Sequence, residues 1–276
     1  MPVDVLAEVV ANTHLSDDYS VLALAAPEIA LKAAPGQFVM IKPSAGIEPL
    51  LRRPFSVFEI LRDPSGTPTG LSILNKRVGV GTALLYSARP GDRLACLGPL
   101  GKPFTPVDAP TEAWMVAGGV GLAPFAMLAE SLVQRGTSAT LFYGARRGAD
   151  LFCTDVFDRL GIRLALATED GSRGDAGFVT GSLERALAAR AGGAAVHLYA
   201  CGPTPMMRVV AELAVRHQCP CDVSLEQVMG CGMGGCYSCV VRARNGAGEW
   251  HFVRSCLAGP VFDSRNVAWE ELGASH

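Results

Sequence analysis

The chain has 276 residues, of which 49% are hydrophobic and 18% are charged, with 24 Lys and Arg against 26 Asp and Glu. This length predicts roughly two domains with buried cores, and the low charged fraction excludes a disordered chain. The charges form no blocks. We therefore expect neither a nucleic-acid partner nor binding to an anionic membrane surface.

The N-terminal residues lack the basic region and apolar core of a targeting segment. The longest uncharged stretch, residues 113–129, contains three glycines and Pro124. Such a stretch predicts a strand, a tight loop and a helix rather than a membrane span. We therefore expect a cytoplasmic protein, whose nine cysteines serve as thiols, metal ligands or redox groups.

Short apolar or alternating runs, separated by turn residues, dominate the first hundred residues. They indicate closely spaced strands of a small antiparallel β-barrel. One helix is expected within this barrel, at residues 82–88. The predicted strands are residues 3–10, 19–25, 38–41, 55–60 and 71–76.

Strands and helices alternate after Phe104, which predicts a parallel sheet covered by helices on both faces. The residues after 222 break this alternation and hold four cysteines, so they predict a separate small module. The predicted strands of the sheet are residues 114–117, 139–143, 163–168 and 196–200, and the helices are residues 123–134, 151–160, 180–189 and 206–217.

The cysteines of the last module carry the most specific pattern. Cys231, Cys236, Cys239 and Cys256 follow the C-x4-C-x2-C…C spacing of plant-type [2Fe–2S] proteins. Glycines between the first two allow backbone N–H groups to point at the sulfurs. A zinc ribbon is the alternative, but its ligands usually come as paired C-x2-C units. The spacing therefore predicts a [2Fe–2S] cluster.

A glycine-rich turn follows the first strand of the second half and opens a helix, at Gly118, Gly119, Val120 and Gly121. Such a turn can bring a diphosphate close to backbone N–H groups at a helix N-terminus. On its own it could equally be a tight strand-to-helix turn. Two more loops are expected at the carboxyl ends of parallel strands and complete a ligand crevice, at Thr168-Glu169-Asp170 and at Cys201-Gly202-Pro203.

The barrel half offers a second place for a diphosphate. Arg53 precedes Pro54-Phe55-Ser56, and Gly81-Thr82 opens the expected helix. An arginine and a helix N-terminus are the usual protein partners of a diphosphate. Phe55 could lie against a flat ring, and the Ser56 hydroxyl could reach a ring nitrogen. Taken singly, such an Arg is usually just a surface residue beside a core residue.

The order of these motifs resembles the ferredoxin–NAD(P) reductase superfamily, through R-P-F-S, V-G-x-G-T, A-G-G-V-G-x-A-P, C-G-P-x-P-M-M and S-L-E-x-x-M-x-C-G-x-G-x-C. More narrowly, the chain is similar to the electron-transfer subunits of NAD-linked dihydroorotate dehydrogenases over nearly its whole length. This resemblance implies a multidomain α+β and α/β fold. It comprises an antiparallel β-barrel flavin domain at residues 1–104, a parallel-sheet nucleotide domain at 105–222, and a small C-terminal iron–sulfur module at 223–276.

The resemblance also implies three cofactors, which are FAD, a [2Fe–2S] cluster and NAD. NAD is expected to dock on the second half with its reactive ring near Cys201, the expected catalytic residue. Arg146 and Arg147 could bind the 2′-phosphate of NADP, or they could be solvated surface. FAD would contact Arg53, Pro54, Phe55, Ser56, Leu74, Asn75, Lys76, Gly81 and Thr82, and NAD would contact Gly118, Gly119, Val120, Gly121, Thr168, Glu169, Asp170, Gly202 and Pro203.

The implied activity is that of an oxidoreductase subunit in a hetero-oligomer, by resemblance a heterotetramer. It would pass electrons between an FMN-containing dihydroorotate dehydrogenase catalytic subunit and NAD+, in pyrimidine biosynthesis. Two alternatives remain open. One is a stand-alone NAD(P)H reductase that feeds a ferredoxin or an oxygenase. The other is a subunit of a bifurcating transhydrogenase or a sulfur-reducing hydrogenase.

Overall fold

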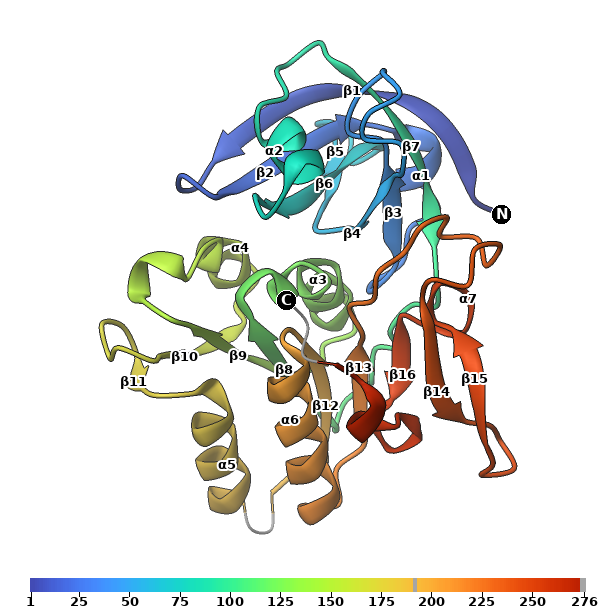
Figure 1. Cartoon of the computed structure of the whole chain (residues 1–276). Coiled ribbons are helices and arrows are strands. Elements are labelled where there is room, and N and C mark those ends of the chain that lie inside the picture. Colours follow the sequence, from blue (N-terminus) through green and yellow to red (C-terminus); the bar gives the residue numbers. More distant parts are fainter. Residues whose placement is uncertain (191–192, 274–276) are drawn as a thin grey trace.

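The first hundred residues fold into a curved antiparallel sheet in the computed structural model, which describes residues 1–190 and 193–273 (Figure 1). Within these residues the sheet has seven strands in the order β4-β3-β7-β1-β2-β6-β5. Val9, Leu24 and Ile41 belong to its buried core, which confirms the predicted barrel architecture. The strands are β1 (Val3–His14), β2 (Tyr19–Ala25), β3 (Phe38–Ile41), β4 (Arg53–Ser56), β5 (Ile60–Arg62), β6 (Pro68–Lys76) and β7 (Arg93–Leu100).

Strands β2 and β3 have the predicted bounds, but the expected strand at residues 55–60 is divided between β4 and β5. The sequence prediction missed β7, which lies between β3 and β1. Its Gly98-Pro99 pair is typical of a turn. A Cβ at Gly98 would lie 2.7 Å from Cγ1 of Val39. The glycine is therefore needed for β3 to pack closely against this strand.

Two helices lie beside this sheet, so the expectation of a single helix is wrong. Helix α1 (Pro27–Ala30) begins at a proline, which suits the first helical position because its missing N–H would have no intrahelical partner. Helix α2 (Val80–Tyr86) begins two residues before the predicted start. Asn12 closes its C-terminal end, because Nδ2 donates to the carbonyl oxygens of Leu85 (3.0 Å) and Tyr86 (2.9 Å).

The second sheet has the strand order β11-β10-β9-β8-β12-β13-β16 among the described residues. All neighbouring pairs are parallel except β13 and β16, which pair antiparallel. The parallel sheet and its strands β8, β9, β10 and β12 were predicted, whereas the parallel strands β11 and β13 and the antiparallel strand β16 were not. The strands are β8 (Glu112–Gly118), β9 (Ala139–Ala145), β10 (Arg163–Thr168), β11 (Asp175–Ala176), β12 (Val196–Cys201), β13 (Cys221–Ser224) and β16 (Val261–Asp263).

Helices cover both faces of this sheet, as predicted. Along β8, Met115 and Ala117 point into a core shared with α3 and α4, while Trp114 and Val116 point into a core shared with α5 and α6. This alternation explains why the strand is apolar throughout. The helical segments are η1 (Gly119–Leu122), α3 (Phe125–Gln134), η2 (Gly148–Asp150), α4 (Thr154–Arg159), α5 (Val179–Ala189) and α6 (Thr204–Arg216).

The C-terminal residues form a hairpin and several short segments beside the nucleotide sheet (Figure 1). Strand β16 comes from this part of the chain, so the part that carries the four cysteines is joined to the nucleotide sheet by backbone hydrogen bonds. The domain limits at 104 and 222 stay a prediction. The segments are β14 (Val240–Arg244), β15 (Trp250–Arg254), α7 (Ser255–Ala258), η3 (Ser264–Asn266) and η4 (Trp269–Glu271).

The barrel and the nucleotide domain share a hydrophobic core. Phe58 and Leu74 of the barrel are buried in the same cluster as Leu122 and Phe125 of the nucleotide domain. Burial of large apolar side chains on both sides fixes how the two parts meet. Among the described residues, no helix is long and apolar enough to cross a bilayer. The cytoplasmic location stays a prediction.

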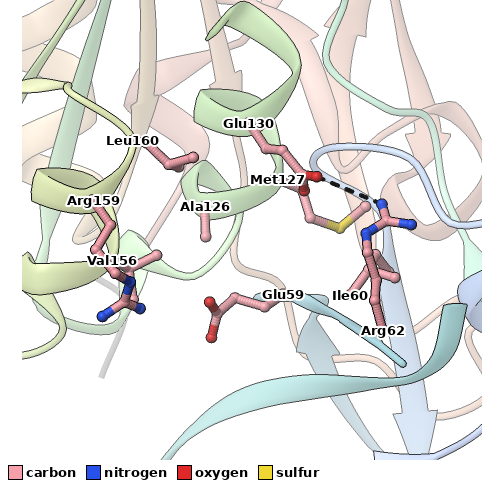
Figure 2. A pocket seen from close by; sticks show the side chains of 9 residues that line it. All are labelled: Glu59, Ile60, Arg62, Ala126, Met127, Glu130, Val156, Arg159 and Leu160. Atoms are coloured by element: carbon pink, nitrogen blue, oxygen red, sulfur yellow. Dashed lines mark ion pairs between the residues drawn. The ribbon is translucent and has the colours of Figure 1, made fainter. Parts of the chain in front are cut away.

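A pocket of about 240 Å³ lies at the rim of this shared core, between β5, α3 and α4 (Figure 2). An ion pair of 3.5 Å between Arg62 and Glu130 lies at one side of it. The Glu59 carboxylate points into the pocket (Figure 2). Burial raises the pKa of Glu59, and the nearby Arg159 guanidinium partly opposes this shift. None of the predicted cofactor residues lines this pocket. Its lining residues come from both domains, so the pocket is part of the domain interface.

The raised pKa of Glu59 predicts a pH-dependent cost to folding. A carboxyl with a raised pKa binds its proton more tightly in the folded state, so stability is lost as the pH rises from the ordinary carboxyl range through the raised value. Glu59→Gln should therefore raise the melting temperature at pH 8, and this gain should vanish toward pH 4. Glu8→Gln, exposed on β1, is the control. Equal melting temperatures at pH 8 for parent and Glu59→Gln would contradict this.

Candidate functional site

The predicted diphosphate partners of the barrel meet in the structure. Arg53 begins β4, and its Nη1 donates to the Leu51 carbonyl oxygen at 2.8 Å. A Cβ on Gly81 would lie 3.1 Å from Nε of Arg53, so the guanidinium rests on the first turn of α2. The first N–H groups of a helix have no intrahelical partner. The Arg53 guanidinium and the first N–H groups of α2 therefore lie side by side, an arrangement that fits a diphosphate.

The Thr82 hydroxyl shapes the loop before this helix. Its Oγ1 accepts from the N–H groups of Val78 (2.9 Å) and Gly79 (3.0 Å) and donates to the Gly79 carbonyl oxygen. Because the Thr82 hydroxyl already makes these hydrogen bonds within the chain, it is not free for a ligand. Gly81 and Thr82 can therefore bind a ligand chiefly through their backbone N–H groups.

Three residues predicted for the flavin lie at the end of β6. Leu74 is buried in the core shared by the two domains. Asn75 is also buried, and its Nδ2 donates to the Thr82 carbonyl oxygen at 3.1 Å. Its Oδ1 is buried without a partner among the described residues. This oxygen can therefore accept a hydrogen bond from a ligand beside α2. Lys76 is exposed and lies 5.5 Å from the ring of Tyr19.

Two turns of the nucleotide domain lie against each other at adjacent strand ends. A Cβ on Gly121 would come within 2.2 Å of the Cys201 carbonyl oxygen, and one on Gly118 within 2.8 Å of Cδ of Pro203. Only glycine permits such approaches. Gly119 has a φ of +55° with open space beside it. The structure therefore brings two of the three predicted loops together, which comprise Gly118, Gly119, Val120, Gly121, Cys201, Gly202 and Pro203.

The third predicted loop lies farther away. Thr168 ends β10, which β9 separates from β8. Its Oγ1 accepts from the N–H of Arg173 at 3.1 Å and donates to the carbonyl oxygen of the same residue. Asp170 accepts from the Ser172 hydroxyl at 2.6 Å, which lowers the pKa of Asp170. Glu169 is exposed. These side chains mainly close their own loop, and they are not gathered beside Cys201.

Cys201 ends β12 with its thiol buried. Burial, and then the charge of Glu226, raises the pKa of Cys201 well above the ordinary thiol value, and a hydrogen bond from Ser224 opposes this. The thiol is therefore neutral at physiological pH. It can pack against a ligand ring or share a hydrogen bond, but it does not act as a thiolate.

The sequence prediction missed Glu226, which follows β13. Its carboxylate interacts with the Cys201 thiol in the nucleotide domain and with Lys76 in the barrel. Burial raises the pKa of Glu226, and the Lys76 ammonium opposes the shift. A carboxyl group whose raised pKa is influenced by both domains is a group that can hold a proton there. The sequence contained a signal for it, because Glu226 is the charged residue of the S-L-E-x-x-M motif.

The four cysteines of the last module lie close together as two pairs. The side chain of Cys236 interacts with that of Cys231, and Cys256 with that of Cys239, while Cys256 also feels the charge of Cys231. Among the described residues, no three His, Cys, Asp or Glu side chains converge on a single ion position. A [2Fe–2S] cluster needs two thiolates on each of two irons. Two neighbouring pairs fit this demand.

Backbone N–H groups already point at these sulfurs. Sγ of Cys231 accepts from the N–H of Gly235 at 3.2 Å, and Sγ of Cys239 accepts from the N–H of Cys256 at 3.5 Å. The Ser238 hydroxyl lies 3.2 Å from Sγ of Cys236 and lowers the pKa of Cys236 to about 6. Such bonds favour thiolates, which are the form that binds iron.

The cysteine loop rests on the barrel. A Cβ on Gly232, whose φ is +71°, would lie 2.6 Å from Cγ of Met40. Cys239 and Cys256 are buried in one cluster with barrel residues that include Met40 and Leu100. Met40 pairs across the sheet with Pro54 of β4. The thiols thus lie one strand away from the residues predicted to hold the flavin, while Cys236 is exposed.

Family models match two parts of the chain. An oxidoreductase NAD-binding domain matches residues 115–212. The iron–sulfur cluster binding domain of dihydroorotate dehydrogenase B matches residues 226–268. The first covers the two turns around Cys201, and the second covers Glu226 and all four cysteines.

Relatives cover almost the whole chain. A protein of Desulforamulus reducens, named dihydroorotate dehydrogenase B (NAD(+)), electron transfer subunit, is 38% identical over 245 residues, which cover 89% of this chain and 90% of that protein. One of the same name from Geobacillus thermodenitrificans is 37% identical over 262 residues, with 94% and 96% covered. A solved NADH-dependent reduced ferredoxin–NADP oxidoreductase, described for flavin-based electron bifurcation, is 30% identical, with a TM-score of 0.83 and 97% and 91% covered.

Proposed function

Because the chain belongs to the family of electron-transfer subunits of dihydroorotate dehydrogenase B (NAD(+)), we propose that it passes electrons between the FMN of a catalytic subunit and NAD+. It is an NAD-linked oxidoreductase subunit of the ferredoxin reductase fold, and its domains imply FAD, a [2Fe–2S] cluster and NAD. The flow runs from dihydroorotate toward NAD+. FMN as the partner's cofactor and this direction are parts of the proposal.

The observation that carries this proposal is the position of the cysteine loop. Gly232 lies on Met40 of the barrel, while Cys236 of the same loop is exposed. A loop with one side on the flavin domain and the other at the surface can connect a bound flavin to an external acceptor. FAD takes up the two electrons of a hydride and releases them singly, and a [2Fe–2S] cluster carries one electron at a time.

We assign the cluster to Cys231, Cys236, Cys239 and Cys256. The flavin diphosphate is assigned to Arg53 and the backbone of Gly81-Thr82, with Pro54, Phe55 and Ser56 beside the ring system. Support comes from the contact between Arg53 and the first turn of α2. The C-terminal end of β6, at Leu74, Asn75 and Lys76, is joined to the same helix by the hydrogen bond from Asn75 to Thr82.

We assign NAD to the facing turns at Gly118–Gly121 and Cys201–Pro203, with Thr168, Glu169 and Asp170 farther along the sheet edge. The role of Cys201 is to position the nicotinamide ring, because its neutral thiol is buried at the crevice. NAD rather than NADP is favoured by the names of the relatives, which specify NAD(+). Of the two candidate arginines, Arg147 is held by Asp150 at 3.1 Å and is therefore less available to a 2′-phosphate, whereas Arg146 is exposed.

A second candidate function is a subunit of an electron-bifurcating reductase. The observation that favours it is the TM-score of 0.83 with the structure of such an enzyme. The named relatives at 37–38% identity favour the first function. The two candidates differ in the protein to which the cluster delivers electrons, so the partner decides between them.

Purified anaerobically, the protein should contain about two irons and two acid-labile sulfides per chain, the composition of this cluster type. Cys256→Ser should lose most of this iron because one of four ligands is gone. Cys219→Ser, a buried thiol of the α6–β13 link, should keep it and serves as the control. Stoichiometric zinc without iron–sulfur absorption would show that the cluster assignment is wrong.

Arg53→Ala should weaken FAD binding about 10- to 100-fold, because a charge-assisted hydrogen bond to the diphosphate is lost. The measurement is fluorescence titration of the flavin-free protein with FAD. Arg52→Ala is the matched control, since the neighbouring Arg52 is held by Asp4 at 2.7 Å. If Arg53→Ala bound FAD as tightly as the parent, the diphosphate would have to lie elsewhere.

Cys201→Ala should slow hydride transfer from NADH to FAD roughly tenfold in stopped-flow mixing, because the ring loses the side chain that positions it. Iron and FAD content should not change. Cys221→Ala removes a buried thiol from the neighbouring strand β13 and should leave the rate unchanged. NADPH should react more slowly than NADH with the parent. An unaltered rate in Cys201→Ala would make this residue a core thiol.

The chain alone should reduce dyes with NADH but should not oxidise dihydroorotate. Dihydroorotate-dependent NAD+ reduction should appear only when the FMN-containing catalytic subunit is added. This experiment tests the proposed function directly. If the chain bound no such subunit and instead reduced a ferredoxin or an oxygenase component efficiently, one of the alternative functions would hold.

A further inference from the structure

An exposed hairpin face extends from the cysteine loop. Strands β14 and β15 pair antiparallel, and directly opposite residues share one face of such a ribbon. Val241 and Ala243 of β14 are buried and belong to the inner face. The outer face, together with Tyr237, is called the Arg–aromatic strip here and comprises Tyr237, Val240, Arg242, Arg244, Trp250, Phe252 and Arg254.

Cations and rings alternate along this strip. Arg244 lies 4.5 Å from the ring centroid of Trp250, and Arg254 lies 4.8 Å from that of Tyr237. Phe252 is 71% exposed and Tyr237 63% exposed. Large exposed rings cost free energy in water. Arg and aromatic residues are enriched in protein interfaces, and Arg, Trp and Tyr are enriched among the few residues that dominate binding energy.

The strip is continuous with the cysteine loop. Tyr237 stands between Cys236 and Cys239, and Nη1 of Arg254 donates to the Gly234 carbonyl oxygen at 2.8 Å. A protein that approaches the exposed Cys236 therefore meets the strip as well. The strip and the exit for electrons belong to one surface.

The strip is also electropositive. Arg242 is paired with Glu271, but Arg244 and Arg254 have no carboxylate partner in the part of the chain that the structure describes. The whole chain carries a net charge of −2, so this local excess is a feature of the hairpin. A complementary surface would carry Asp or Glu side chains, since charge pairing guides encounter and fixes register.

From this arrangement we infer that the Arg–aromatic strip docks on an acidic surface of the catalytic subunit, with Phe252 inserted into an apolar recess of that surface. The inference rests on the proposed function. It adds that this chain carries the positive side of the interface, and it names the residues of this chain that form the contact. Cys236 would then face the partner while Arg244 and Arg254 orient the two proteins.

The role of the positive charge is tested with the variant Arg244→Glu. The variant, loaded with FAD and cluster, is titrated with the catalytic subunit, and the dissociation constant of the complex is measured. This constant should rise at least tenfold at low ionic strength, and the difference from the parent should shrink as salt screens the charges. Arg93→Glu is the matched control, because it makes the same charge change at an exposed position of β7. NADH-dependent dye reduction should be equal in all three proteins.

The ring is tested with Phe252→Ala, which should also weaken association about tenfold or more. Leu31→Ala removes an exposed apolar side chain of the barrel and should have no effect. Dihydroorotate-dependent NAD+ reduction should fall at limiting catalytic subunit and recover at saturation. Iron content must match the parent, which separates docking from damage to the cluster.

If both variants bound the catalytic subunit as well as the parent, the strip would not be the docking surface, although the proposed function would stand. If the parent itself did not bind that subunit, the proposed function would fail and this inference with it. A third outcome is a dimer of this chain alone in sedimentation that Phe252→Ala dissociates. The strip would then join two copies, and the inference would be wrong.

Discussion

The contact between the cysteine loop and the barrel is the constraint on which the rest of the arrangement depends. Gly232 has a positive φ and leaves no room for a side chain above Met40. A larger residue there would lift the loop from β3 and move the thiols away from β4. Electron transfer between cofactors weakens steeply with distance, so the loop must lie this close for a flavin on β4 to communicate with it. Cys239 and Cys256, buried with Met40 and Leu100, hold the loop in place through apolar packing.

In the nucleotide domain, too, a glycine allows two segments to come into close contact. The two facing turns of this domain follow β8 and β12, which are distant in sequence but adjacent in the sheet. Gly121 lets the first turn touch the Cys201 carbonyl, and the shared core around Phe58 fixes the barrel above the α3 side of the sheet. Besides burial, the charge of Glu226, from the module, raises the pKa of Cys201, and the charge of Lys76 acts on Glu226 in turn. The barrel, the nucleotide domain and the C-terminal module thus meet at one crevice mainly through shared apolar packing.

The sequence predicted what is encoded locally. The cysteine spacing and the glycine turn after a buried strand are short patterns. Arg53-Pro54-Phe55-Ser56 and the helix start at Gly81-Thr82 are also short patterns, but their contact depends on the tertiary fold. The missed features depend on tertiary context. Strand β7 contains Gly98-Pro99, which favours a turn by itself, yet Val39 packs over the glycine and the strand continues. Strand β16 was missed because only its partner β13 makes it part of the sheet. Glu226 was missed because its neighbours come from two other parts of the fold. The placement of Thr168 two strands from β8 follows from strand order, which periodicity does not reveal.

The two thiol pairs differ in exposure, and this difference gives the site a direction. Cys239 and Cys256 are each 2% exposed and face the barrel core, whereas Cys236 is exposed and Cys231 is half-buried. Burial raises the pKa of Cys256 to about 12, while the Ser238 hydroxyl lowers that of Cys236 to about 6. A group held by all four thiols therefore has one side in an apolar setting against the flavin domain and the other side toward solvent. Shielding on the inner side protects the path within the chain, and access on the outer side is what an external electron donor or acceptor requires. The arrangement suits a subunit that exchanges electrons across an interface better than an enzyme that completes its reaction within one chain.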